Sequence, residues 1–201
     1  VQQNRLAGNE VFLTLNVFGG RGGWKQFPDS VPVTASGEKL QHEYGGICPT
    51  HAEWRQSRLN MLTEWVRRFG GDGGISGIWL DFIRYPGKWE RKNPEIPDVC
   101  YCQRCLDQFQ KDKEVVFPTH LQTTAEKSAW IKTHVPALWM EWKKNQVTSF
   151  VKEARNILDA NPHDRKLILG VFLVPWRKSD FDGALFRVSH QFAPVRSSLL
   201  F

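Results

Sequence analysis

The sequence predicts an α/β fold, a partial (β/α)8 barrel of the TIM type with long loops after its strands. Short, mostly apolar runs alternate with longer segments whose apolar residues recur at helical spacing, in the order strand, helix, strand, helix, strand. The segments that follow the strands are long, whereas those that precede them are short. In α/β barrels the active site is built from the loops that follow the strands, so this asymmetry locates the expected site.

Three apolar, β-rich runs are the expected strands, over residues 11–18, 77–86 and 167–174. The second run is almost continuously apolar, which is typical of a strand buried on both faces of a parallel sheet. A doubly wound sheet is the competing architecture, but no glycine-rich phosphate loop follows any of these runs. The barrel is therefore the preferred fold.

Helical spacing predicts long helices over residues 51–69 and 137–159, and a short helix that begins near Cys102. Thr50 and Glu53 match a capping box, in which Thr50 would be the N-cap of the first long helix. Four tryptophans on the helices are expected to pack in the core: Trp54, Trp65, Trp139 and Trp142.

The composition is that of a folded globular protein. The chain has 201 residues, of which 41% are hydrophobic and 24% charged, enough for one domain with a substantial core. No apolar run is long enough to cross a bilayer, so we expect a soluble protein without a membrane segment. The net charge of +6 comes from scattered basic residues, which indicates a solvated surface and argues against nucleic acid as a partner.

The chain as a whole is expected to be one incomplete barrel domain over residues 1–201. Three strands cannot close a barrel of eight, so we expect a fragment that lacks elements at both ends. After Phe181 the sequence contains no convincing strand, and residues 183–201 stay unassigned.

Asp81 is the first candidate catalytic residue, because an acidic side chain inside an apolar strand is costly to bury without a partner or a task. At the C-terminal end of a barrel strand it would point into the active site. Alternation predicts that Asp81 and Ile83 share one face of the strand, with Leu80 and Arg84 on the other. A structural ion pair between Asp81 and an arginine is the alternative.

Candidates for substrate binding surround this strand end. Asn16 occupies the matching late position on the first strand, where an amide could bind a hydroxyl or satisfy backbone groups of the loop. Arg84 could reach the site if the strand end is twisted or bulged. Nine tryptophans are present, and the face of an indole packs well against a sugar ring. The candidate platforms, in or beside expected loops, are Trp24, Trp89 and Trp176.

Four cysteines form the sharpest pattern. Cys100, Cys102 and Cys105 lie within six residues, and Cys48 stands alone in the long loop after the first strand. Four thiolates make a closed tetrahedral zinc site, which is structural because it has no open position. Disulfides are the alternative, but three cysteines this close together are awkward to pair. We therefore expect one structural Zn²⁺ bound by all four.

The run GIWLDFIRYP over residues 77–86 resembles the fourth-strand region of glycoside hydrolase-like barrel families distantly allied to α-galactosidases. The segment over residues 47–54 also resembles the region just upstream in such proteins. The resemblance implies a (β/α)8 barrel in which the strand-end aspartate, here Asp81, is the nucleophile.

The run CYCQRCLDQF over residues 100–109 is similar to the zinc-binding segment of family 42 β-galactosidases. In that family a lone upstream cysteine, which corresponds to Cys48, completes the set of four. The two resemblances together cover residues 11–180.

These patterns predict a glycoside hydrolase that acts on an oligo- or polysaccharide through two carboxylates. Asp81 is expected to be the nucleophile or base, and the candidates for the acid are Glu90, Asp180 and Asp182. The first alternative is a non-catalytic carbohydrate-binding barrel that keeps the aromatic platforms but lacks the acid pair. The second is a zinc-ribbon module that binds nucleic acid, which would need a basic stripe around the cysteines.

Overall fold

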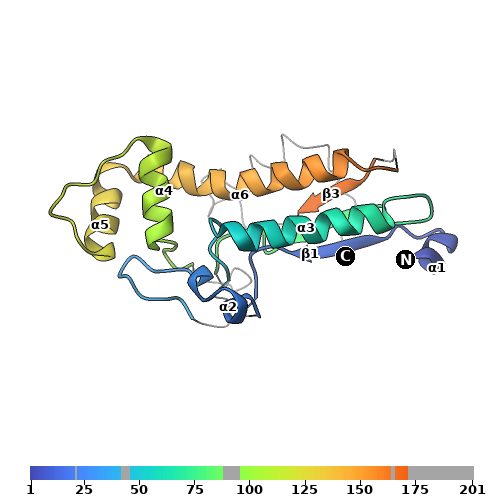
Figure 1. Cartoon of the computed structure of the whole chain (residues 1–201), viewed down its shortest axis with the longest axis horizontal. Helices are drawn as coiled ribbons and strands as arrows, with labels where there is room; N and C mark the ends of the chain where they lie inside the picture. The colour runs from blue at the N-terminus through green and yellow to red at the C-terminus, as the bar shows by residue number, and fades with distance from the viewer. Residues whose placement is uncertain (21, 42–45, 88–95, 164–165, 172–201) are drawn as a thin grey trace, which may run out of the picture.

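The computed structural model describes residues 1–20, 22–41, 46–87, 96–163 and 166–171 (Figure 1). Three strands form one sheet in the order β1-β2-β3, and both neighbouring pairs are parallel. The strands are β1 (Phe12–Asn16), β2 (Gly77–Asp81) and β3 (Ile168–Val171). The α/β class and the parallel order of the strands are confirmed for this part of the chain. A closed barrel stays a prediction, because three strands form only part of one.

The helices gather in three places (Figure 1). Helices α3 and α6 run alongside the sheet, α2, α4 and α5 lie toward the end to which the strands point, and α1 lies at the opposite end. Among the described residues, no helix combines the length and the apolar composition that crossing a membrane requires. The helices are α1 (Gln2–Leu6), α2 (Gly22–Gln26), α3 (Ala52–Phe69), α4 (Gln103–Lys113), α5 (Thr124–His134), α6 (Pro136–Asp159) and the 3-10 helix η1 (Pro28–Ser30).

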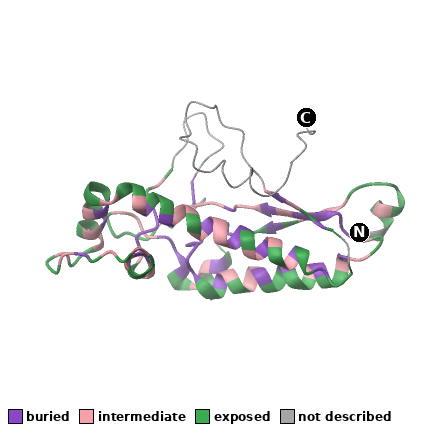
Figure 2. Cartoon of the chain, turned by 90° about the horizontal axis from the view of Figure 1, so that it is seen from above, coloured by how far each residue is buried: buried purple, intermediate pink, exposed green. Residues whose placement is uncertain are grey.

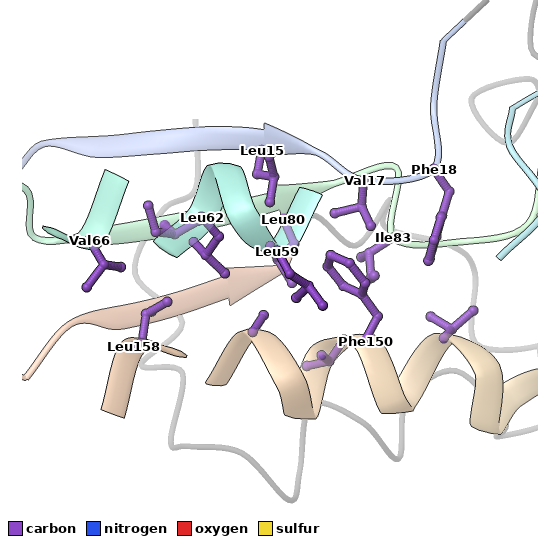
Figure 3. Packing of buried hydrophobic residues seen from close by; sticks show 14 of the residues in the cluster. Leu15, Val17, Phe18, Leu59, Leu62, Val66, Leu80, Ile83, Phe150 and Leu158 are labelled. Carbon is purple, nitrogen blue, oxygen red and sulfur yellow. The ribbon is translucent and has the colours of Figure 1, made fainter. Parts of the chain in front are cut away.

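The larger core lies between one face of the sheet and helices α3 and α6, which lie on the same side of it (Figure 2). Leu15 of β1 and Leu80 of β2 are register partners, and both are buried. They share this layer with Leu62 of α3 and Phe150 of α6 (Figure 3). Because burying such a side chain contributes about 1.5–3 kcal/mol, this layer holds the sheet and the two helices together.

A second core surrounds α4, α5 and the start of α6. The rings of Tyr101 and Trp139 are stacked with their centres 5.0 Å apart, and Trp142 stacks on the same Trp139 ring at 5.0 Å. Phe109 meets Trp139 edge-on at 4.9 Å. The four cysteines belong to this cluster or pack against it, so the aromatic core supports them. The expected burial of the helix tryptophans is confirmed for Trp54, Trp139 and Trp142, and Trp65 is partly buried.

The other face of the sheet carries polar side chains near the strand ends. Thr14 and Asn16 are exposed on it, and no helix of the described residues covers it (Figure 2). Trp79 lies on the same face, opposite Gly170 of β3 in the register. A Cβ on Gly170 would lie 2.3 Å from the Trp79 ring, so only glycine fits there. In a closed barrel this face would be the interior.

The second strand is shorter than predicted. β2 ends at Asp81, because Phe82 adopts a φ of 50°, a left-handed conformation that a bulky residue rarely takes. This turn breaks the alternation along the chain. Ile83 is 5% exposed and packs in the core beside the helices, so the prediction that it shares a face with Asp81 was wrong.

The start of α3 also differs from the prediction. His51, rather than Thr50, is the N-cap, and its Nδ1 accepts a hydrogen bond from the backbone N–H of Trp54 at 3.1 Å. A complete capping box instead begins α5, where Thr123 and Glu126 each bind the other's backbone N–H. Apolar spacing did not predict α5, because few apolar residues recur at helical spacing within it.

Candidate metal centre and strand-end site

The four cysteine sulfurs converge, and all lie within 4.8 Å of one another. The Sγ atom of Cys48 is 3.4 Å from that of Cys105 and 3.8 Å from that of Cys102. Four sulfurs bound at about 2.3 Å to a tetrahedral Zn²⁺ would lie about 3.8 Å apart, so the spacing fits a site of four thiolates. A disulfide needs a separation of about 2.05 Å, and all four cysteines are free. The four could therefore hold a metal ion.

Two segments far apart in the sequence deliver these thiols. Cys48 lies in the loop after β1, and the N–H of the preceding Ile47 donates to the carbonyl of Phe18 at 2.8 Å. Cys102 is the N-cap of α4, and Cys105 lies in the first turn of that helix. A bound metal would therefore join the loop after β1 to the loop after β2.

Polar groups favour negative charge on the sulfurs. The backbone N–H of Val33 donates to Sγ of Cys100 at 3.3 Å, and the hydroxyl of Thr50 lies 3.1 Å from Sγ of Cys48. Hydrogen bonds from the neighbouring thiols, that of Cys100 foremost, hold the pKa of Cys48 well below its usual value. Burial raises the pKa of Cys100, and hydrogen bonding with the other thiols, that of Cys100 foremost, raises the pKa of Cys105. A metal binds thiolates rather than thiols, so its binding would release protons from the cluster.

A polar network closes the outer side of the cluster. Arg104 of α4 donates from Nη1 to Oδ2 of Asp29 at 2.8 Å and from Nη2 to the Asp29 carbonyl at 3.0 Å. Oδ1 of Asp29 lies 3.1 Å from Nε2 of His51. Since Nδ1 of His51 accepts the Trp54 N–H, Nε2 carries the proton and donates it to Asp29. The network thus connects η1, α3 and α4 around the cysteines.

Protonating Asp29 should weaken this network. Hydrogen bonds from Arg104 and then His51 lower the pKa of Asp29 below its ordinary value of 3.8. Because the folded pKa is lowered, the stabilisation is present above the unfolded pKa and is lost as the pH falls through the folded pKa. The side chain is 68% exposed, so solvent screening limits the effect to about 1 kcal/mol or less.

We therefore expect Asp29→Asn to melt about 2–4 °C below the wild-type chain at pH 7, with the difference shrinking as the pH falls through the lowered pKa of Asp29. Thermal melts of both proteins between pH 7 and pH 2.5 measure it. A difference that is the same at both ends of this range would contradict the assignment.

Asp81 and Asn16 lie side by side at the ends of β2 and β1, where they are register partners. Oδ1 of Asp81 accepts the N–H of Phe82 at 2.8 Å, and Oδ1 of Asn16 accepts the N–H of Gly19 at 2.9 Å. Among the described residues, no hydrogen bond holds Oδ2 of Asp81 or Nδ2 of Asn16. Each side chain is thus fixed through one oxygen and keeps a second polar atom for a ligand.

Gly19 packs closely against the side chains of Phe82 and Asn16. A Cβ at Gly19 would lie 2.5 Å from the Phe82 ring and 2.7 Å from Oδ1 of Asn16. Gly19→Ala should therefore displace both side chains and lower the free energy of unfolding by about 1–3 kcal/mol. The melting temperature should fall by about 2–12 °C. Gly22→Ala is the matched control, because a Cβ there meets nothing within 4 Å. Equal melting temperatures of the two variants would show that a methyl group fits at Gly19.

The other predicted site residues are placed only in part. Nε1 of Trp24 donates to the carbonyl of Gly46 at 2.8 Å, and its ring packs against the larger core. Arg84 donates from Nη1 to the carbonyl of Gly87 at 2.9 Å, with its guanidinium carbon 5.1 Å from the centre of the Phe82 ring. Contact of either residue with a substrate stays a prediction. The predicted residues outside the described part of the chain are Trp89, Glu90, Trp176, Asp180 and Asp182.

One residue beside the cysteines was not predicted. Lys143 of α6 is partly buried, and its ammonium donates to the carbonyl of Val99, next to Cys100. The sequence did contain a signal for it. Lys143 follows the buried Trp139 by four residues and precedes the buried Val147 by four, so it lies on the apolar stripe of its helix.

The described residues form an α/β fold with three parallel strands and four cysteines that could hold a metal ion, and this fold is similar to part of solved β-galactosidases. A family 42 β-galactosidase from G. stearothermophilus, solved as a catalytic mutant, matches with a TM-score of 0.55 and 14% identity over 83% of this chain and 26% of that one. A β-galactosidase from Rahnella sp. R3 matches with a TM-score of 0.55 and 19% identity over 84% of this chain and 26% of that one.

A third similar structure is a β-galactosidase from Bacillus circulans sp. alkalophilus, with a TM-score of 0.54 and 15% identity over 85% of this chain and 28% of that one. This chain therefore spans about a quarter of the length of the structures that it matches. No family model and no curated protein matches the sequence. At these identities the likeness concerns the fold.

Proposed function

We propose that this chain is part of a glycoside hydrolase that acts on an oligo- or polysaccharide, and that residues 1–201 form one portion of its barrel domain. The observation that carries the proposal is the pairing of Asp81 with Asn16 at the C-terminal ends of neighbouring parallel strands. Active sites of α/β barrels are built at this end of the strands. The likeness in fold to family 42 β-galactosidases supports the same class of substrate.

In this proposal Asp81 is the nucleophile or the base. The Phe82 N–H fixes one carboxylate oxygen, so the other oxygen is oriented toward the anomeric carbon or toward a water that attacks it. The amide of Asn16 donates to a sugar hydroxyl, which positions the ring over the strand ends. A second carboxylic acid protonates the leaving oxygen, and the candidates are Glu90, Asp180 and Asp182. Its separation from Asp81 would be about 5–5.5 Å in a retaining enzyme and about 6.5–9.5 Å in an inverting one.

The four cysteines hold a structural Zn²⁺ in this proposal. Four thiolates fill a tetrahedral coordination shell, so the metal supplies rigidity rather than an open position for substrate. Cys48 lies in the loop after β1, which also carries Gly19, and the other three cysteines lie in the segment after β2 that carries Arg84 and leads into α4. The metal would therefore fix the two loops that border Asn16 and Asp81.

The test is an assay of the full-length protein against a panel of aryl glycosides and oligosaccharides, together with its metal content. Hydrolysis of at least one glycoside and about one zinc per chain would support the proposal. Saturable sugar binding without hydrolysis would favour the non-catalytic carbohydrate-binding barrel. A protein that neither hydrolyses nor binds any sugar of the panel would refute a carbohydrate function.

A further inference from the structure

Lys143 brings a positive charge to the inner side of the cysteine cluster. Its ammonium donates a hydrogen bond to the carbonyl of Val99 and lies 4.5 Å from the centre of the Tyr85 ring. Val99 directly precedes Cys100, and Tyr85 belongs to the segment that follows β2. The lysine therefore connects α6 to the segment that enters the metal centre and to the segment that leaves the strand carrying Asp81.

A cation in this position needs an anion to stabilise it. Burial lowers the pKa of Lys143, while the negative charges of Asp98 and of the Cys100, Cys105 and Cys48 thiolates oppose this shift. Asp98 already pairs with Lys132 at 2.5 Å. Among the described residues no carboxylate forms an ion pair with Lys143. The cysteine sulfurs, when ionised, therefore share with Asp98 the role of balancing its charge.

A divalent metal bound by the four thiolates would in turn need positive charge nearby. Four thiolates and one divalent cation carry a net charge of about −2, and a buried charge of this size is costly unless cations lie close to it. Arg104 of α4 interacts electrostatically with Cys48 and Cys102, but its guanidinium also pairs with Asp29. Lys143 reaches the segment beside Cys100 from α6, and among the described residues it forms no ion pair with a carboxylate, although the charge of Asp98 also acts on it.

We propose that Lys143 is the counter-charge of the metal centre, and that its ammonium, held against the Val99 carbonyl, sets how tightly the four thiolates retain a divalent metal. This inference rests on the proposed zinc site and adds a residue to it that does not bind the metal. Lys143 also ties α6 to the centre, so metal binding strengthens the contact between this helix and the loop after β2.

The test compares four variants of the full-length protein by competition for Zn²⁺ against a chromophoric chelator at pH 7.5. Lys143→Met removes the charge and the hydrogen bond, Lys143→Gln keeps a donor without charge, and Lys143→Arg keeps the charge. Lys152→Met removes an exposed charge from the same helix and is the matched control. Loss of a partner group around metal ligands costs about 10–100-fold in metal affinity, so we expect at least tenfold weaker binding in Lys143→Met and Lys143→Gln. Lys143→Arg and Lys152→Met should stay within about threefold of the wild-type chain.

The outcomes separate the two proposals. If the wild-type chain takes up no Zn²⁺, the proposed zinc site is wrong and the inference falls with it. If the wild-type chain binds Zn²⁺ and Lys143→Met binds it as tightly as Lys152→Met does, the counter-charge alone is wrong. If Lys143→Gln matches the wild-type chain, the hydrogen bond to Val99 rather than the charge is what matters, which also overturns the inference. Should Lys143→Met fail to fold, the comparison of the Gln and Arg variants decides.

Discussion

Cys102→Ser should abolish stoichiometric metal binding and destabilise the chain. Cys102 is the least buried of the four cysteines, so the exchange of sulfur for oxygen disturbs packing little and acts through the lost ligand. A structural zinc site contributes several kilocalories per mole to folding, and we expect a loss of about 3 kcal/mol or more. For a chain of this size that corresponds to a fall of about 6–12 °C in the melting temperature.

The measurements are metal content and thermal melting with and without a strong chelator. The chelator should lower the melting temperature of the wild-type chain and leave that of Cys102→Ser unchanged. Trp139 and Trp142 stack on each other in the core that contains the cysteines, so their fluorescence should change on metal removal from the wild-type chain. A Cys102→Ser chain that retains one metal and melts like the wild type would contradict the site.

Asp81→Asn should lower turnover by about 10²–10⁴-fold in the full-length protein and leave its folding intact. The amide oxygen of asparagine can still accept the Phe82 N–H, so the strand end keeps its shape while the charge is lost. Asp72→Asn is the matched control, because Asp72 is an exposed carboxylate in the loop that precedes β2. That loop is at the opposite end of the strand, where residues of α/β barrels contribute to stability rather than catalysis.

The kinetic constants and the melting temperatures of these variants separate two roles for Asp81. Unchanged turnover in Asp81→Asn would exclude a catalytic role. A large fall in melting temperature with little change in turnover would support a structural role for the carboxylate instead.

The parallel strands and the clustered cysteines could be predicted because each depends on a short-range pattern. Continuous apolar runs such as the one around Leu80 have one favourable environment, the buried face of a sheet. Residues at the ends of parallel strands meet at one edge, and Asn16 and Asp81 do so in register. Four thiols in two segments that follow neighbouring strands could share a metal ion, and their sulfurs lie close together.

Other features depend on atoms that are far apart in the sequence. Thr50 has the sequence of an N-cap, but its hydroxyl lies between the sulfurs of Cys48 and Cys105. The ring of His51 takes over the cap because Asp29 orients it from η1. A hydroxyl and an imidazole can each satisfy the first turn of a helix, so local chemistry alone does not choose between them.

The α/β class, the three strands, the main helices and the set of four cysteines could be predicted from the sequence, because hydrophobic periodicity and clustered thiols are patterns within short segments. The sharp turn at Phe82, the partners of Thr50 and the contact of Lys143 with Val99 depend on residues that meet only in the folded chain. The Phe82 ring lies where a side chain at position 19 would be, so the turn depends on a glycine that is more than 60 residues away in the sequence. Lys143 is partly buried, and the groups around it, the carbonyl of Val99, the carboxylate of Asp98 and the cysteine cluster, are brought together only by the fold.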